Sequence, residues 1–333
     1  MHAISTEKES PLISLKEVSV IYKVKERALG KEKNLYAVDG VSLEVLKGEN
    51  LSLVGESGCG KTTLGKTIVG LIKPSSGIVF YKGKDLWKLR GDEWKNARRN
   101  LQIIHQNPYD AVNFTKTIFQ ILSVPLKEHK LVNSELELKE KIYSLLEMVG
   151  LGREIAEKYP HQLSGGQLQR VIIARAISLT PELIVADEPV SMIDVSLRIS
   201  ILDLLLSLRR KYNIATVFIT HDLGLARYYG RDGKIAIMYL GNIVEVGFIE
   251  KVIREPLHPY TKALLFAVPV PDPELAKKRG FPPLRSPEVT DPTIMLPGCK
   301  FYPRCIYARD ICKEKRPSLK MIDDRWVACH LLK

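Results

Sequence analysis

Residues 51–63 read LSLVGESGCGKTT, an apolar run followed by a glycine-rich loop. The stretch from Gly55 to Thr62 matches the pattern of Gly, four residues, Gly, Lys and Ser or Thr, which forms a phosphate-binding loop between a strand and a helix. In such a loop the backbone N–H groups of residues 56–61 surround phosphate oxygens, Lys61 adds a positive charge, and the Thr62 hydroxyl binds Mg²⁺. The stretch therefore predicts an α/β core that binds a nucleotide.

Hydrophobic patterns on both sides of this loop agree with an α/β layer fold. Residues 12–54 alternate apolar and polar positions, which is typical of strands with one buried face. The runs LIVAD at 183–187 and TVFIT at 216–220 are continuously apolar, as buried parallel strands are. We expect a further strand at 101–105 and a helix from Thr62 to Ile72.

A helical insert is expected between the phosphate loop and these buried strands, over residues 117–158. Ser134 and Glu137 have the spacing of a capping box, and the pattern stops at Gly150. Between Ser134 and Gly150 the sequence repeats apolar residues at helical spacing on one face, namely Leu138, Ile142, Leu145 and Val149.

Composition and charge restrict the class of protein. The chain has 333 residues, 45% of them hydrophobic, and a formal charge of +12. The charge is compatible with nucleic acid, an anionic membrane surface or phosphate ligands, but the basic residues are scattered, so we favour a solvated basic surface. Apolar runs are too short for a membrane-spanning helix and the N-terminus lacks a signal-peptide pattern, so we expect a soluble, intracellular chain.

Two further motifs add chemistry to the phosphate loop. The strand LIVAD ends in Asp187, which would hold Mg²⁺ through water, and Glu188 follows, placed to accept a proton from an attacking water. The stretch LSGGQLQR at 163–170 places a Ser-Gly-Gly turn at the start of a helix, which is a second anion-binding site. One nucleotide pocket does not need two such sites, so two chains are expected to share their nucleotides.

With these motifs the chain resembles the ATP-binding cassette (ABC) ATPases over roughly residues 12–255. The resemblance implies a P-loop NTPase (RecA-like) core with an N-terminal antiparallel β subdomain, a helical signature subdomain at about 107–178 and a small C-terminal Cys-rich element. It also implies that two subunits face each other, with the signature of one covering the γ-phosphate held by the other. Glu188 and His221 are both present, so we expect a site competent for hydrolysis.

The resemblance assigns roles to individual residues. Gln106 contacts Mg²⁺ and the attacking water, His221 contacts the γ-phosphate, and Tyr22, with Tyr36 as the alternative, stacks on adenine. Cys59 within the loop is interpreted as a small filler residue rather than a redox group. The expected catalytic residues are Glu188, His221, Gln106 and Lys61, and the expected Mg²⁺ ligands are Thr62 and Gln106. The expected ATP-binding residues are Tyr22, Gly55, Glu56, Ser57, Gly58, Cys59, Gly60, Lys61, Thr62, Thr63, Gln106, Asp187 and His221, and those that act across the dimer are Leu163, Ser164, Gly165, Gly166, Gln167 and Asp194.

The C-terminal part resembles one group within that family, the ATPases of oligopeptide and dipeptide importers. The stretch EPLHPYTKALLFAVP at 255–269 and the ending GCKFYPRCIYARDIC…ACH carry this resemblance. It implies a paralogous ATPase as partner, two permeases docking near Gln106 and residues 107–120, an external solute-binding protein, and a place on the cytoplasmic face of the membrane. Tyr109 favours the second of the two ATPases of such importers.

Other functions remain open at the level of the sequence. Some relatives carry oligosaccharides rather than peptides, and an ATPase does not touch the cargo. A nucleic-acid-associated ABC ATPase of the repair type would use the positive charge, but its long coiled-coil or zinc-bearing insertion has no counterpart in the hundred residues between Thr63 and Leu163. We therefore expect no nucleic-acid partner.

Four of the five cysteines lie near the end of the chain, at Cys299, Cys305, Cys312 and Cys329. Their spacing contains no CxxC pair, whereas a zinc ribbon has such pairs. Disulfides are disfavoured in a reducing compartment. The resemblance implies a 4Fe-4S cluster, which four thiolates among basic residues suit. The alternatives are zinc, and disulfides or free thiols. We expect residues 256–333 to form a C-terminal region with a proline-rich linker at 269–297 and a small, separate cysteine element at 298–330, structural or assembly-related in role.

Overall fold

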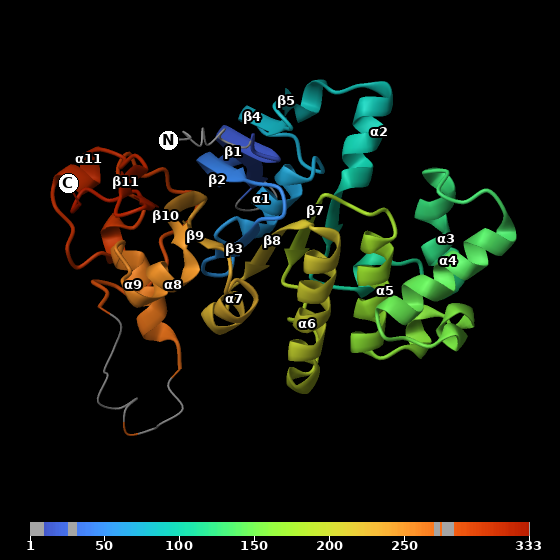
Figure 1. Cartoon of the computed structure of the whole chain (residues 1–333). Helices are drawn as coiled ribbons and strands as arrows, with labels where there is room; N and C mark the ends of the chain where they lie inside the picture. The colour runs from blue at the N-terminus through green and yellow to red at the C-terminus, as the bar shows by residue number, and fades with distance from the viewer. Residues whose placement is uncertain (1–9, 26–31, 270–273, 275–282, 333) are drawn as a thin grey trace, which may run out of the picture.

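The computed structural model describes residues 10–25, 32–269, 274 and 283–332. Three parts are visible in Figure 1: a central body with two sheets, a helical lobe around α3, α4 and α5, and a C-terminal part beside β10. The mixed α/β architecture agrees with the prediction from the sequence.

The first sheet is antiparallel and has four strands in the order β2-β1-β4-β5. Its strands are β1 (Ile13–Lys25), β2 (Glu32–Val45), β4 (Ser76–Tyr81) and β5 (Lys84–Asp85). Buried residues alternate with more exposed ones at the end of β2, and β1 contains both buried and exposed residues, because one face of this sheet packs on the core and the other faces solvent. The N-terminal antiparallel β subdomain is therefore present.

The second sheet has eight strands in the order β11-β12-β10-β9-β3-β8-β7-β6. Neighbouring strands from β9 to β6 are parallel, and those from β11 to β9 are antiparallel. Every residue of β3, β7 and β8 is buried, as the continuous apolar runs predict. The strands are β3 (Asn50–Val54), β6 (Leu101–Ile104), β7 (Leu183–Asp187), β8 (Ala215–Thr220), β9 (Lys234–Tyr239), β10 (Asn242–Phe248), β11 (Lys320–Ile322) and β12 (Arg325–Val327).

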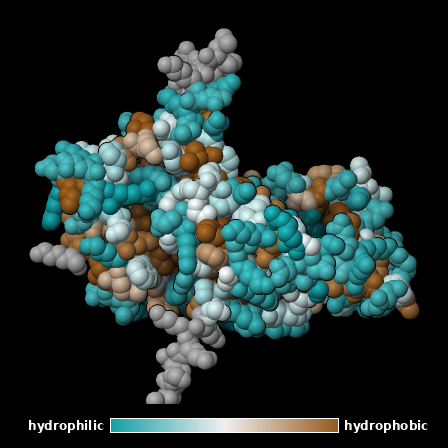
Figure 2. All heavy atoms as spheres, turned by 90° about the horizontal axis from the view of Figure 1, so that it is seen from above, coloured by the Kyte–Doolittle hydropathy of each residue, from teal (hydrophilic) through white to brown (hydrophobic). Residues whose placement is uncertain are grey.

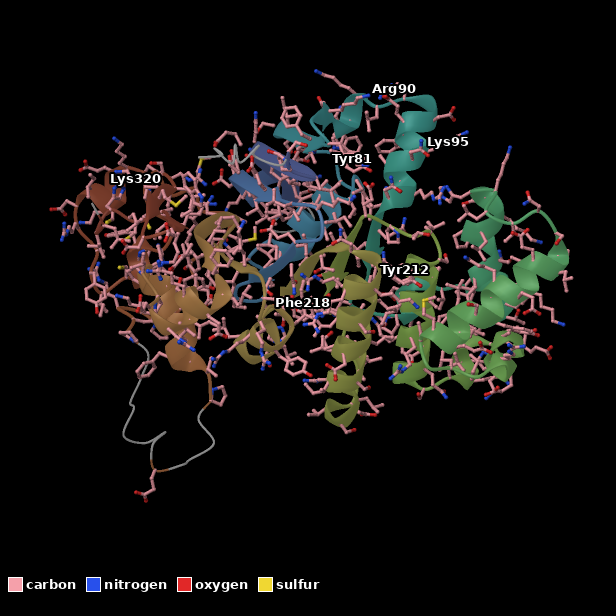
Figure 3. The ribbon with its side chains drawn as sticks, viewed as in Figure 1. Tyr81, Arg90, Lys95, Tyr212, Phe218 and Lys320 are labelled. Atoms are coloured by element: carbon pink, nitrogen blue, oxygen red, sulfur yellow. The ribbon has the colours of Figure 1, made fainter. Side chains whose placement is uncertain are left out.

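Helix α1 (Lys61–Ile68) contacts both sheets, and its buried apolar side chains, Leu64 and Ile68, belong to the hydrophobic cluster that joins them. It ends earlier than the sequence pattern indicates, because Val69 caps it and Gly70 has a positive φ of 71°. A polar contact also ties the sheets together, since the hydroxyl of Tyr81, marked in Figure 3, donates to Glu182 at 2.7 Å, next to the start of β7. Helix α2 (Gly91–Asn100) leads into β6.

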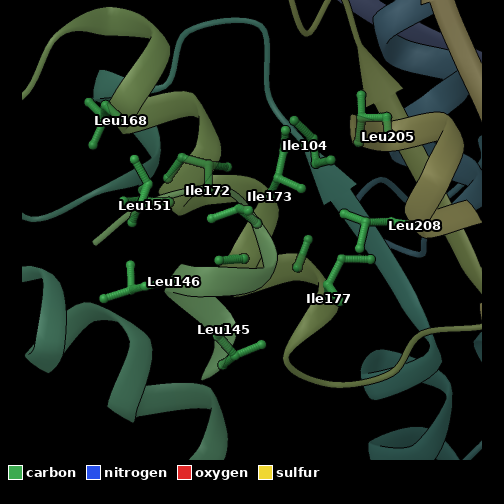
Figure 4. Close-up of a cluster of buried hydrophobic side chains, with 14 of the residues drawn as sticks. Ile104, Leu145, Leu146, Leu151, Leu168, Ile172, Ile173, Ile177, Leu205 and Leu208 are labelled. Carbon is green, nitrogen blue, oxygen red and sulfur yellow. The ribbon is translucent and has the colours of Figure 1, made fainter. Parts of the chain in front are cut away.

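The helical lobe contains α3 (Ile118–Glu128), α4 (Glu135–Met148) and α5 (Gly165–Ile177), and it packs on α6 (Val195–Tyr212) and the core sheet. Figure 4 shows Leu145 and Leu146 of α4, Ile172 and Ile173 of α5, and Leu205 of α6 in one buried cluster. The four apolar residues expected on one face of α4 are all buried. Sequence prediction and structure thus agree for this lobe.

The predicted capping box at the start of α4 is only half formed. The Ser134 hydroxyl accepts the N–H of Glu137 at 3.1 Å, but the Glu137 carboxylate accepts the N–H of Asn133 at 2.7 Å instead of that of Ser134. The carboxylate therefore reaches one residue further back than the motif requires, and the helix still begins where the spacing predicts.

The sequence analysis expected a small, separate cysteine element at residues 298–330. In the structure this part of the chain is joined to the core sheet. Strand β12 pairs with β10, so the core sheet continues into the cysteine-rich segment. Helices α7 (Leu223–Tyr229), α8 (Ile249–Arg254), α9 (Pro259–Ala267) and α11 (Ile311–Glu314) complete this side of the molecule, where a third buried cluster includes Tyr239, Tyr260, Phe301 and Cys305. Much of the predicted linker, 270–273 and 275–282, lies outside the described residues.

The surface seen from above in Figure 2 is mainly hydrophilic, with hydrophobic residues in small patches. No helix in the described ranges is both long and apolar enough to cross a bilayer.

Candidate functional site

The phosphate loop connects the end of β3 to the start of α1, with Gly60 as the N-cap of the helix. Gly60 has φ 104°, and a Cβ there would lie 1.9 Å from the carbonyl oxygen of Ala37. Only glycine tolerates both the backbone conformation and the approach of β2. The first turn of α1 therefore presents free backbone N–H groups at the loop, which is the arrangement that binds an anion.

Lys61 is buried and its ammonium is held inside the loop. Its Nζ donates to the carbonyl oxygens of Gly55 at 2.8 Å and Glu56 at 2.9 Å. The Cys59 side chain lies beside this ammonium, with its Sγ 3.8 Å from Lys61 Nζ and 3% of its surface exposed. Burial raises the pKa of the Cys59 thiol, so the side chain is a neutral, small hydrophobic group, which agrees with its interpretation as a filler.

Thr62 and Asp187 lie together at the mouth of the loop. The Thr62 hydroxyl donates to Oδ1 of Asp187 at 3.1 Å, and Asp187 is almost fully buried at the end of β7. Burial raises the pKa of Asp187, and the neighbouring Glu188 carboxylate adds to the shift. A hydroxyl and a carboxylate are hard oxygen ligands of the kind that Mg²⁺ prefers, and a bound cation would stabilise the Asp187 charge.

Glu188 stands between two other predicted residues. Its Oε1 lies 2.9 Å from Nδ1 of His221, and its Oε2 accepts a hydrogen bond from Nε2 of Gln106 at 3.2 Å. These residues follow the ends of the parallel strands β7, β8 and β6, so the sheet brings them together. The backbone of Glu188 has a positive φ of 45°, a conformation that is costly for a non-glycine residue and recurs at active sites.

The second anion site lies at the start of α5. Ser164 caps the helix through a complete capping box: its hydroxyl accepts the Gln167 N–H at 3.3 Å and Gln167 Oε1 accepts the Ser164 N–H at 3.1 Å. An added Cβ at Gly165 would lie 3.6 Å from the Met192 carbonyl oxygen, and one at Gly166 3.2 Å from Leu197. The signature therefore packs beside residues 192–197, which include the predicted interface residue Asp194.

The surface around Asp194 is apolar and open. Asp194 is exposed at the N-terminus of α6, and Met192, Val195 and Leu197 expose 59%, 74% and 41% of their surfaces. Leu163 is buried behind the signature. Exposed apolar side chains next to an uncovered helix N-terminus are features of a surface that another chain covers.

Both candidate aromatic residues lie on the antiparallel sheet. Tyr22 on β1 pairs with Leu35 of β2, and Tyr36 is the next residue along β2. Tyr22 exposes 38% of its surface, and Tyr36 directly precedes Ala37, which approaches the phosphate loop. The adenine-stacking residue therefore stays a prediction with two candidates.

Two residues that contact the phosphate loop were not identified as site residues from the sequence. The Arg304 guanidinium donates to both carboxylate oxygens of Glu56, at 3.0 and 2.9 Å, and the Tyr260 hydroxyl accepts the Glu56 N–H at 3.0 Å. Tyr260 belongs to the HPY stretch and Arg304 precedes Cys305, so both lay within motifs that were interpreted in other terms. The C-terminal region is thus in direct contact with the loop.

The four C-terminal cysteines come together around one small cavity of about 10 Å³, which His258 and His330 also line. Burial raises the pKa of Cys299 to about 12 and also raises the pKa values of Cys305 and Cys329. Burial thus favours the neutral thiol at Cys299, Cys305 and Cys329, whereas metal binding needs thiolates.

The cavity between the cysteines is too small for the expected cluster. Four sulfur donors around one cavity have the chemistry of a soft-metal site, but the cavity has room for about one water molecule, less than a four-iron cluster requires. Within the described part of the chain, no group of three or more His, Cys, Asp or Glu side chains is arranged to hold a metal ion. Two of the neighbouring basic residues also face the main body, since Lys300 pairs with Asp39 and Arg304 with Glu56.

A separate hollow of about 810 Å³ lies between β1, β2, β10 and the C-terminal segment. Its lining includes Lys16, Glu17, Arg316 and Trp326, none of which belongs to the phosphate loop. This hollow is therefore separate from the predicted nucleotide site at the phosphate loop.

Comparison with protein families finds two matches. Residues 38–191 match the ABC transporter family, and residues 244–312 match the oligopeptide/dipeptide transporter C-terminal region. The second match begins within β10, twelve residues before the boundary expected at residue 256.

Curated proteins and solved structures agree with these matches. A putative oligopeptide transport ATP-binding protein, YkfD of Bacillus subtilis, is 44% identical, and the alignment covers 91% of each chain. The oligopeptide transport ATP-binding protein OppF of Salmonella typhimurium is 39% identical over 97% of each chain, and the dipeptide transport ATP-binding protein DppF of Haemophilus influenzae 39% over 96% of each. The ATP-binding cassette MJ0796, solved as a dimer bound to ADP and Pi, aligns with a TM-score of 0.63 and 30% identity, covering 71% of this chain and 98% of that one.

Proposed function

The chain belongs to the ABC transporter family, among the oligopeptide and dipeptide transport ATP-binding proteins, and from this premise we propose that it hydrolyses ATP to drive peptide uptake. The observation that carries the proposal is the contact of Glu188 with both Gln106 and His221, directly beside Asp187 and the phosphate loop. ABC fold and family agree with what the sequence motifs indicate.

We infer the following roles for the chain's own residues. The loop N–H groups and Lys61 bind the β- and γ-phosphates, and Thr62 and Gln106, with Asp187 through water, hold Mg²⁺, which neutralises phosphate charge when bound. Glu188 accepts a proton from the attacking water, and His221 leaves Glu188 to contact the γ-phosphate. The direct contact of His221 with Glu188 supports these roles, because it shows that both side chains reach the same point.

The complete site is proposed to need a second chain. The exposed signature and the apolar residues around Asp194 would face the phosphate loop of a partner ATPase, so that Ser164, Gly165 and Gln167 meet its γ-phosphate. We propose a paralogous ATPase as this partner, forming a heterodimer.

Two permeases and an external solute-binding protein would complete the transporter, with this chain on the cytoplasmic face. Permease docking is proposed at residues 107–120, where Tyr109 and Phe114 are exposed and stack with ring centroids 6.1 Å apart. Exposed aromatic residues next to Gln106 would transmit the state of the nucleotide site to the membrane subunits.

The test of this function is uptake in cells that lack the gene. Loss of labelled oligopeptide or dipeptide uptake, restored by the parental gene and not by a Lys61→Ala variant, is expected. Loss of oligosaccharide uptake with normal peptide uptake would contradict the peptide cargo. Normal uptake of both, with salt-sensitive binding of the purified chain to duplex DNA, would favour the nucleic-acid alternative instead.

For the C-terminal cysteines we propose a 4Fe-4S cluster held by Cys299, Cys305, Cys312 and Cys329, with zinc as the alternative. The proposal starts from the four cysteines that line one small cavity. As placed in the described residues they do not form a metal-binding group, so the thiols would have to move to hold a cluster. Protein purified without oxygen is expected to contain about four irons per chain and to absorb near 400 nm. One zinc and no iron per chain would favour the zinc alternative. A protein that contains neither iron nor zinc would refute both proposals.

The division of the chain also remains a proposal. We place the ATPase domain at 12–255, its helical subdomain at about 107–178 and the C-terminal region at 256–333. Helices α3 to α5 support the second range, while the pairing of β10 with β12 means that the last region completes the core sheet.

A further inference from the structure

The cysteine-rich segment contacts the phosphate loop through a partly buried ion pair. Arg304 and Glu56 are 248 positions apart in the sequence, and the Arg304 side chain is only 6% exposed. The Arg304 backbone is fixed on both sides: its N–H donates to Phe301 and its carbonyl oxygen accepts the Arg285 N–H. The direction of the guanidinium is therefore set by the fold of the C-terminal segment.

Tyr260 acts on the same loop through the backbone. Its hydroxyl accepts the Glu56 N–H, while the carbonyl of the same peptide group, that of Gly55, accepts from Lys61 at 2.8 Å. In a trans peptide the N–H and C=O groups point in opposite directions, so a bond that fixes one also fixes the other. Tyr260 therefore sets the orientation of the carbonyl that holds the Lys61 ammonium.

Both contacts rest on a rigid base of aromatic rings. Tyr239, Tyr260 and Phe301 pack with ring centroids 4.6 to 5.4 Å apart. The Arg304 guanidinium carbon lies 5.7 Å from the ring centre of Tyr239 and 5.9 Å from that of Phe301. Burial and cation–π contact limit the conformations open to Arg304, so its charge stays at Glu56.

We propose that Arg304 and Tyr260 are positioning residues that hold the phosphate loop in the shape that binds ATP. They act through Glu56 and the peptide that carries the Gly55 carbonyl. The inference rests on the proposed function in that it assigns ATP to this loop. It makes the C-terminal region part of the nucleotide site and not only a structural or assembly element.

The test is titration of the purified full-length chain with a fluorescent ATP analogue in the presence of Mg²⁺. Arg304→Gln removes the charge, Tyr260→Phe removes only the hydroxyl, and Glu56→Gln keeps the size of its side chain. Each is expected to raise the Kd about fivefold or more, the lower end of measured coupling between sites. Arg304→Lys should restore part of the affinity, because it returns the charge without the guanidinium geometry.

Arg316→Gln is the matched control. Arg316 belongs to the same segment and pairs with Asp39 at 2.9 Å, but it does not reach the loop, so its Kd should equal the parental one. The double variant Glu56→Gln, Arg304→Gln should have a Kd no higher than the higher of the two single-variant Kd values, because the two side chains act as one unit.

The outcomes separate the two claims. A parental chain that binds no ATP analogue would overturn the proposed function. Parental binding with unchanged Kd in both Arg304→Gln and Tyr260→Phe would overturn the positioning role alone, even if their melting temperatures fall. If Arg304→Gln does not fold, Tyr260→Phe decides, since it preserves the aromatic packing.

Discussion

Glu245 is the buried charge that joins the C-terminal segment to the core, and replacing it should destabilise the fold strongly. It is 0% exposed, and its carboxylate accepts the backbone N–H groups of Leu257 at 3.1 Å and His258 at 3.0 Å. The Arg325 guanidinium on β12 lies 3.9 Å away and is also buried. Glu245→Gln leaves the Arg325 charge uncompensated and turns an amide donor toward groups that are themselves donors.

The size of the effect follows from this geometry. Two unit charges 3.9 Å apart attract by about 4 kcal/mol at an effective dielectric constant near 20. Breaking a buried pair by removing one partner typically costs about 3–5 kcal/mol. An unfolding entropy of about 2.1 cal/mol/K per residue gives about 0.7 kcal/mol/K for 333 residues, so the melting temperature should fall by about 4–7 °C.

The assay is thermal unfolding followed by circular dichroism, with Glu93→Gln as the control. Glu93 pairs with Lys84 at 2.6 Å, but both side chains are more than half exposed, so its replacement should cost less than about 1 kcal/mol. A Glu245→Gln variant that melts within about 1 °C of the Glu93→Gln variant would refute the reasoning.

Two further predictions concern packing and pH. Leu138→Ala should lower the free energy of unfolding by about 2–5 kcal/mol in urea titrations, because Leu138 is fully buried. The control is Leu136→Ala on the same helix, where the side chain is 72% exposed and the change should be about 0.5 kcal/mol or less. Equal effects of the two substitutions would contradict the packing of the helical lobe. Burial lowers the pKa of His258 from 6.5 to about 3, so its neutral form stabilises the fold fully above pH 6.5, and this stability is lost as pH falls toward about 3. The variant His258→Asn keeps an acceptor for the Tyr260 N–H but has no group that titrates in this range. The unfolding free energy of the variant should therefore fall less than that of the parental protein between pH 6.5 and about 4. Parallel curves of unfolding free energy against pH for the two proteins would argue against a buried neutral histidine.

Much of the nucleotide site could be predicted because its residues occupy the ends of recognisable strands. Asp187, Glu188 and His221 follow continuous apolar runs, and parallel strands place their carboxyl ends at one edge of the sheet. The positive φ of Glu188 had no such signal, since it depends on the Glu188 N–H bonding to Ile219 of the neighbouring strand.

The C-terminal contacts could not be predicted for a different reason. Strands β11 and β12 have three residues each, too few for a periodic pattern. Arg304 looked like one of several basic residues around the cysteines, and only the tertiary fold directs it to Glu56 rather than to the sulfur atoms. Sequence patterns report local structure, whereas this contact is set by packing between distant segments.

The central claim, that Glu188 takes the proton from the attacking water, is tested most directly by Glu188→Gln in the assembled transporter. The amide keeps the size of the side chain, and its oxygen can still accept the hydrogen bond from Gln106, but it accepts a proton poorly. ATP should therefore bind with parental affinity while phosphate release falls by about 10²-fold or more. Binding and phosphate release are measured on the same preparation. Parental turnover by this variant would contradict the account.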